Sequence, residues 1–114
     1  MKRELKITPY IIVQIWYPSD INTEVTEKFL EVVKEFPFDR SLGKETIQVA
    51  SNANKNGIEV ISVMEVKQGK LEEAWNWGRN RMGGFQSIKG LEYDMRLWST
   101  LTEAFEGSEY SVPE

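Results

Sequence analysis

Apolar residues recur along this chain with two different spacings, one typical of strands and one typical of helices, and the succession of these spacings predicts its secondary-structure elements. From Tyr10 to Tyr17 the side chains are almost continuously apolar and rich in β-branched and aromatic residues. Such a run is typical of a strand covered on both faces, and Pro18 ends it. The next segment predicts a helix that Asn22 or Thr23 caps and Pro37 ends. Its apolar residues recur at steps of three and four along one stripe, made of Val25, Phe29, Val32, Val33 and Phe36.

The middle of the chain predicts a β-hairpin followed by a second helix. Apolar and polar residues alternate from Thr46 to Asn52, the segment Ala53–Gly57 supplies turn residues, and Ile58–Val66 is the partner strand. The Gly-Gly pair at 83–84 weakens the end of the second helix, which we expect to stop near Phe85. The apolar stripe of that helix consists of Leu71, Ala74, Trp75, Gly78, Met82 and Phe85.

The segment from Leu91 to Phe105 fits both periods. Alternate residues fit one face of a strand, whereas residues at steps of three and four fit a helical stripe. Periodicity alone does not decide between them. We favour a strand over Leu91–Ser99 followed by a short helical turn, because Thr100 and Glu103 have the spacing of a capping box.

The resulting order, βαββαβ, predicts an α+β domain with a four-stranded antiparallel sheet and both helices on one face. A single ferredoxin-like domain spans 1–114, with its core at 10–105 and a loose tail at 108–114. We assign to the helix-covered face Ile11, Val13, Ile15, Tyr93, Met95 and Leu97. The opposite face then carries Ile12, Gln14, Trp16, Gln48, Ala50, Ile61, Val63, Arg96 and Trp98. An apolar and aromatic surface of this size marks an interface, so we expect the sheets of two chains to pair.

With these elements the chain resembles the dimeric α+β barrel superfamily, whose ferredoxin-like protomers pair their open sheet faces. The superfamily includes antibiotic-biosynthesis-type monooxygenases and many small uncharacterised proteins. The resemblance covers residues 10–105 and is carried by the strand Ile58–Val66, the helix Trp75–Phe85 and the strand Tyr93–Trp98. It implies a homodimer and the possibility of a pocket between sheet and helices, but it assigns no catalytic residue. Members that degrade haem use a histidine, and this chain has none.

Composition and charge exclude several classes of function. The chain has 114 residues, 40% of them hydrophobic, which is enough for one core. Its net charge of −4 disfavours nucleic acids and anionic membranes, and no apolar stretch has membrane-spanning length. Without cysteine or histidine there is no disulfide, thiolate nucleophile, Cys-based zinc site or imidazole base. We therefore expect a cytoplasmic protein that uses no cofactor and no metal.

Four residues of the open face form the candidate ligand-binding site. Trp16 and Trp98 supply apolar walls, while Gln14 and Arg96 supply polar anchors. Apolar walls around a few polar groups are the usual composition of a small-molecule pocket. Alternatively, these side chains fill the dimer core, and Arg96 pairs with Asp94 or with a carboxylate of the partner chain.

The second predicted helix carries two further tryptophans and two arginines. Trp75 and Trp77 lie two residues apart, so they cannot both face one core, and one of them is expected at a contact or pocket edge. Arg79 and Arg81 precede the Gly-Gly pair, and we expect both to be solvated at the end of the helix.

Three functions from different classes remain. The chain is a small dimeric protein that binds an apolar or aromatic molecule, a cofactor-independent oxygenase-like enzyme, or a structural or regulatory interaction module. The first is our leading hypothesis. The interaction module predicts a filled dimer core and an exposed apolar patch, for instance around Trp77. The enzyme requires a buried proton acceptor with a shifted pKa among Asp94, Glu65, Tyr93 and Tyr17.

Overall fold

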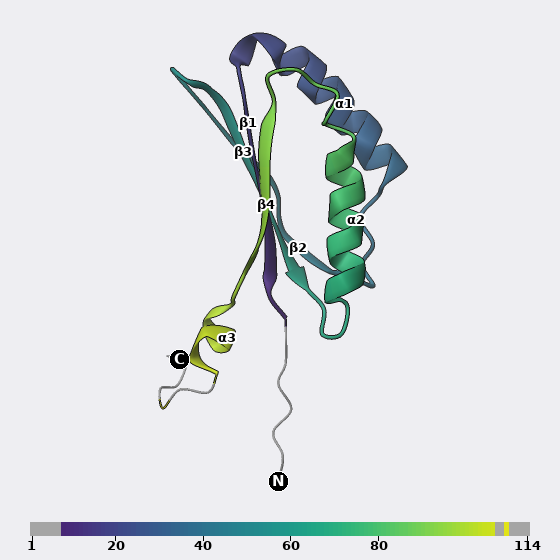
Figure 1. Cartoon of the computed structure of the whole chain (residues 1–114), viewed down its shortest axis with the longest axis vertical. Helices are drawn as coiled ribbons and strands as arrows, with labels where there is room; N and C mark the ends of the chain where they lie inside the picture. The colour runs from purple at the N-terminus through teal and green to yellow at the C-terminus, as the bar shows by residue number, and fades with distance from the viewer. Residues whose placement is uncertain (1–7, 107–108, 110–114) are drawn as a thin grey trace.

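The structure is a computed structural model that describes residues 8–106 and 109 (Figure 1). The chain follows the predicted βαββαβ order, and a short helix follows the last strand. No helix in this described part is long and apolar enough to cross a membrane. The predicted loose tail, 108–114, lies outside the described residues except for Glu109. The elements are β1 (Tyr10–Tyr17), the 3₁₀ helix η1 (Ser19–Ile21), α1 (Asn22–Glu35), β2 (Gly43–Asn54), β3 (Gly57–Val66), α2 (Leu71–Gly83), β4 (Glu92–Trp98) and α3 (Leu101–Phe105).

The four strands form one antiparallel sheet in the order β2-β3-β1-β4, an arrangement that is compatible with a ferredoxin-like fold. Both α1 and α2 lie on one side of this sheet (Figure 1). The register between β1 and β4 pairs Ile11 with Leu97 and Ile15 with Tyr93. Because cross-strand partners share a face, the predicted helix-facing residues of these two strands are confirmed.

The last segment is a strand followed by a helical turn, as predicted. The Thr100 hydroxyl accepts a hydrogen bond from the Glu103 N–H at 3.2 Å, and the Glu103 carboxylate accepts one from the Thr100 N–H at 2.9 Å. These two bonds form the predicted capping box at the start of α3. The same carboxylate also accepts a hydrogen bond from the Thr8 N–H at 3.1 Å, which ties α3 to the segment before β1.

The start of α1 differs from the prediction. Neither Asn22 nor Thr23 caps the helix, because Ile21 occupies the N-cap position and offers no side-chain hydrogen bond. The Asn22 Oδ1 instead accepts a hydrogen bond from the Tyr17 hydroxyl at 2.8 Å. The predicted end of the helix is confirmed, since α1 stops two residues before Pro37.

The β2–β3 hairpin is confirmed, and its turn depends on one glycine. Lys55 and Asn56 form the two-residue turn, and the Asn56 N–H donates a hydrogen bond to the Asn54 Oδ1 at 2.8 Å. Gly57 follows with a φ of 127°, which side chains rarely allow. A Cβ there would also lie 2.5 Å from the Tyr17 carbonyl oxygen on β1. Glycine is therefore required at the start of β3, where the hairpin lies against the end of β1.

The edge strand β2 is irregular, which corrects one predicted position. Its register with β3 shifts between Glu45 and Ile47 and again between Ile47 and Ala50. Each shift inserts an extra residue and so changes the alternation of faces. The pattern predicts Gln48 on the open face, but Gln48 lines the space between the sheet and the helices.

Apolar side chains between the sheet and the helices form two separate clusters. Within the described residues, β2 contributes to neither cluster, so the helices cover the other three strands better than this edge. The first cluster consists of Ile15, Tyr17, Val25, Val32, Met82, Phe85 and Ile88. The second consists of Ile11, Leu42, Met64, Val66 and Ala74.

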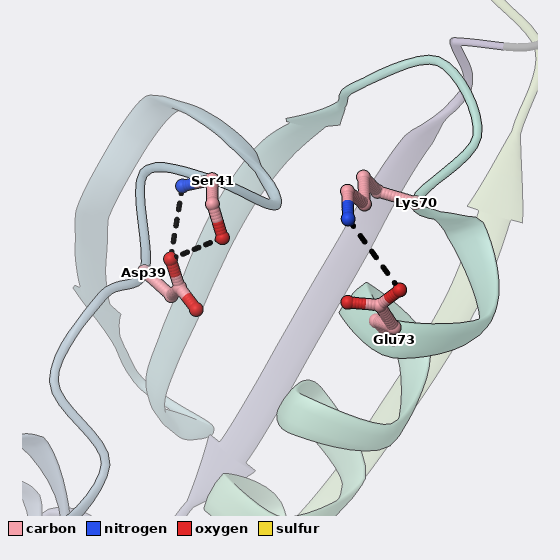
Figure 2. A network of polar contacts seen from close by, with 4 residues as sticks. All are labelled: Asp39, Ser41, Lys70 and Glu73. Atoms are coloured by element: carbon pink, nitrogen blue, oxygen red, sulfur yellow. Dashed lines mark hydrogen bonds and ion pairs between the residues drawn. The ribbon is translucent and has the colours of Figure 1, made fainter.

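The loop between α1 and β2 is held by Asp39 (Figure 2). Its Oδ1 accepts hydrogen bonds from the Ser41 hydroxyl at 2.6 Å and from the Ser41 N–H at 2.9 Å. These bonds, with the charge of Lys70 as a smaller cause, hold the pKa of the Asp39 carboxyl below its usual value of 3.8. Lys70 itself pairs with Glu73 at 3.6 Å at the start of α2.

A substitution at Gly84 tests the contact between the end of α2 and α1. A Cβ at Gly84 would lie 2.6 Å from Cγ2 of Val32, which is buried and stiff at χ1. We expect Gly84→Ala to lower the free energy of unfolding by about 1–3 kcal/mol, the usual cost of overpacking, in urea denaturation. Gly83→Ala is the matched control, because its Cβ meets no atom within 4 Å. It should raise stability by about 0.5–1 kcal/mol, and equal effects of both variants would contradict this contact.

The lowered pKa of Asp39 predicts a pH dependence of stability. The folded state favours the ionised carboxylate, so the stabilisation is present above pH 3.8 and is lost as the pH falls through the lower folded pKa. Asp39→Asn should therefore be less stable than the wild type at neutral pH, with the difference vanishing in acid. Urea denaturation across pH 2–7 measures this. Asp20→Asn, which removes the same charge at an exposed position on η1, is the control variant. An identical pH dependence of stability in both variants would contradict the role of the Asp39 hydrogen bonds.

Candidate functional site

A cleft of about 280 Å³ lies between the sheet and the two helices. Its walls come from both apolar clusters, so the cleft occupies the space where a continuous core would be expected. The pleat of β1 directs alternate side chains toward it, and one face of each helix closes the other side. The apolar wall includes Ile11, Ile15, Val25, Val60, Met64 and Phe85.

The edge strand β2 forms the open lip of this cleft. Glu45, Gln48, Val49 and Ser51 all line it, although the Val49 side chain is still 44% exposed. The second register shift, between Ile47 and Ala50, brings the adjacent residues Gln48 and Val49 to the same side, which a regular strand does not allow. The lip therefore presents polar and apolar groups together at the entrance.

Trp77 and Arg81 project from one face of α2 into the cleft, because they lie four residues apart on a helix. The Trp77 Nε1–H donates a hydrogen bond to the Pro37 carbonyl oxygen at 3.1 Å. The Phe38 ring meets the indole edge-on, with 5.4 Å between centroids and an interplanar angle of 86°. The loop that Asp39 stabilises therefore fixes the orientation of Trp77.

Arg81 is partly buried, and the described residues give its guanidinium neither a hydrogen bond nor an ion pair. Its Cζ lies over the Trp77 ring, 4.7 Å from the centroid, and its Nε is shielded from solvent without a hydrogen-bond partner in the described part of the chain. Burial lowers the pKa of Arg81, and the charge of Glu45 opposes that effect. The prediction of a solvated Arg81 is therefore wrong, whereas Arg79 is exposed as expected. Nothing in residue type distinguishes the two arginines; only their helical phase relative to Trp77 does.

Tyr17 supplies another polar group to the cleft. Its hydroxyl donates to Asn22 Oδ1, and both residues line the wall beside the start of α1. Burial raises the pKa of the Tyr17 hydroxyl. The phenol therefore stays protonated at neutral pH and acts as a hydrogen-bond donor.

The predicted site residues share the other, open face of the sheet but are spread along it; they are Gln14, Trp16, Arg96 and Trp98. Gln14 is opposite Asp94, Trp16 is opposite Glu92, and Trp98 is opposite Tyr10. Trp16 and Tyr10 are six residues apart on β1, so the two tryptophans are separated by about 20 Å along the sheet at about 3.3 Å per residue. Within one chain the structure does not bring these two side chains into one cavity.

Arg96 already has a partner on that open face. Its Nη2 lies 2.7 Å from the Asp94 Oδ2, as the alternative interpretation of the sequence predicts. Its Cζ lies 5.8 Å from the centroid of the Trp98 ring. Trp98 is 46% exposed, so this end of the open face is accessible to solvent.

The two tryptophans of α2 line different depressions, as their spacing predicts. Trp77 lines the cleft, while Trp75 lines a shallow groove between α2 and β4 that also includes Arg79 and Tyr93. The sequence pattern predicts one tryptophan at a pocket edge but assigns neither Arg81 nor Glu45 to a binding site. The available signal was the spacing of Trp77 and Arg81, which places a cation beside an aromatic ring on one helix face.

The cleft has the composition of a binding site. The described residues contain no group of three or more Asp or Glu side chains arranged to hold a metal ion. The cleft instead offers apolar walls, a cation, and hydroxyl and amide groups. Neither a protein-family model nor a curated protein sequence matches this chain.

Proposed function

We propose that the protein binds a small apolar or aromatic molecule in the cleft between the sheet and the helices. The observation that supports this function is the divided core: apolar side chains of two clusters face a shared space of about 280 Å³. Interiors of proteins are normally packed without such voids. The volume lies just below the range of roughly 300–1,000 Å³ that ligand pockets cover, which favours a small occupant.

The oxygenase-like alternative finds less support in the side chains. Of the four predicted proton acceptors, only Tyr17 is buried, and its raised pKa makes it a poor base at neutral pH. Asp94 is paired with Arg96 on the open face, away from the cleft. The interaction-module alternative expects an exposed patch around Trp77, yet Trp77 is half-buried against Phe38 and Arg81. Binding is therefore the function that we propose.

We further propose that the functional unit is a homodimer formed through the open sheet faces, as in a dimeric α+β barrel. This face carries Ile12 opposite Val63 and Gln14 opposite Ile61 at its centre. Exposed Trp98 and the 39% exposed Ile47 extend the apolar surface toward two edges. Pairing two such faces would remove these side chains from water.

Binding in the cleft is tested with N-phenylnaphthylamine, a neutral aromatic probe whose fluorescence rises in apolar surroundings. Wild-type protein should enhance its fluorescence. Ser62 lies on β3 and lines the cleft, so Ser62→Phe should fill the space and weaken binding by about tenfold or more. Ser87→Phe, at an exposed position after α2, is the matched control and should bind like the wild type.

Two results would contradict cleft binding. One is the absence of enhancement by the wild-type protein. The other is equal affinity of Ser62→Phe and wild type, which would place the probe elsewhere, provided that thermal unfolding shows both variants to be folded.

Native mass spectrometry tests the dimer. We expect wild-type protein at twice the chain mass, and Ile61→Lys at the mass of one chain, because two lysines would face each other at the centre of the interface. Leu30→Lys is the control, since Leu30 is 63% exposed on α1, and it should remain dimeric. A wild-type protein that stays monomeric at every concentration would contradict this proposal.

A further inference from the structure

The cleft contains one cation, Arg81, to which the described residues offer neither a hydrogen bond nor an ion pair. Among the described residues, no hydrogen bond or ion pair is formed by any nitrogen of the Arg81 guanidinium, and its Nε is closed off from water. A buried donor without a partner costs free energy, and the cost is larger for a charged group. Such a group in a folded protein calls for a physical explanation.

The neighbours of Arg81 orient the cation but do not satisfy it. The Trp77 ring lies against the guanidinium, with 4.7 Å between the ring centroid and Cζ, and attracts the positive charge. The ring accepts no hydrogen bond from the N–H groups in the plane of the guanidinium. Glu45 on the β2 lip attracts the cation through space without forming an ion pair. Trp77 is in turn fixed by the Pro37 carbonyl oxygen, so the position of the cation is built into the fold.

We propose that the occupant of the cleft is an apolar molecule carrying one carboxylate or a comparable anionic group, and that Arg81 binds this group. This inference rests on the proposed function and adds the chemical class of the ligand. A planar guanidinium presents its donors at its edge in a fork that matches a carboxylate. The apolar wall around Ile15, Val25 and Phe85 then holds the remainder of the molecule.

The remaining lining of the cleft makes an amphiphile, an apolar molecule with one anionic group, a better fit than a fully polar anion. Apart from Arg81, the polar lining comes from the β2 lip, from Ser62 on β3 and from a group at the start of α1 that consists of Tyr17, Asn22 and Thr26. Within that group the Tyr17 hydroxyl already donates to Asn22. A second anionic group on the ligand would approach Glu45 at the lip and be repelled. One negative charge on an otherwise apolar molecule satisfies the cation without this repulsion.

The experiment compares octanoate with octanol, which share one alkyl chain and differ in the charged group. NMR titration follows the indole N–H of Trp77, which lies beside Arg81, and that of Trp98, which lies on the open face. Octanoate should shift the Trp77 resonance. In Arg81→Met the preference for octanoate over octanol should fall by about tenfold or more. Arg79→Met, the exposed arginine of the same helix, is the matched control and should leave the preference unchanged.

Stability of the ligand-free variant separates a binding role from a structural one. If Arg81 is retained for a ligand, Arg81→Met should unfold at the same or a higher temperature than the wild type, since it removes an unsatisfied cation. A lower unfolding temperature together with an unchanged preference would assign Arg81 a structural role and overturn the proposal.

The remaining outcomes distinguish this inference from the proposed function. If both compounds shift Trp77 but the preference does not depend on Arg81, cleft binding stands and the anionic ligand is rejected. If neither compound shifts Trp77, or only Trp98 responds, both proposals fall.

Discussion

The close approach of α2 to the sheet is the contact on which the rest of the structure depends. A Cβ on Gly78 would lie 3.2 Å from the Met95 Sδ on β4, and Ala74, one turn earlier, is completely buried. Small side chains on this face allow the helix to lie directly on the sheet. The adjacent face carries Trp77 and Arg81, which line the cleft together with residues of β2. One helix thus closes the core on one side and leaves it open on the other.

This asymmetry explains why the core is divided rather than merely small. The helices reach the sheet at two places, one near Tyr17 and Phe85 and one near Ile11 and Ala74. The space between them is bordered by the bulged edge strand, which lacks a regular alternation with which to fill it. Filling the space would require a larger side chain at a position such as Ser62, and the chain has a hydroxyl there. The described part of the chain therefore carries a void within its helix–sheet interface.

The elements were predictable because each has a local signal, whereas the cleft depends on relations between elements. The apolar run at 10–17 and the capping box of Thr100 and Glu103 are readable in a single window, and both are confirmed. The bulges in β2 have no such signal, so Gln48 was assigned to the wrong face. Asn22 is a typical helix-capping residue in the sequence, but its Oδ1 accepts a hydrogen bond from the Tyr17 hydroxyl and does not cap the helix.

Two arginines of this chain lie beside tryptophan rings, and a comparison of their surroundings shows why the cleft, rather than the open face, is the candidate binding site. Arg96 and Arg81 each lie near a tryptophan ring, and residue type alone gives no reason to prefer one. The alternation of side chains along β4 places Arg96 beside Asp94, two residues earlier, so its charge is balanced within the chain. Arg81 lies on a helix whose facing wall is apolar, so its charge is balanced only weakly by Glu45. An arginine that its own chain leaves unbalanced retains its hydrogen-bonding capacity for another molecule. The difference between the two sites therefore lies in the partner that each arginine already has. The partner of Arg96 lies two residues away on the same strand and is readable from the sequence, whereas the surroundings of Arg81 follow only from the packing of α2 against the sheet.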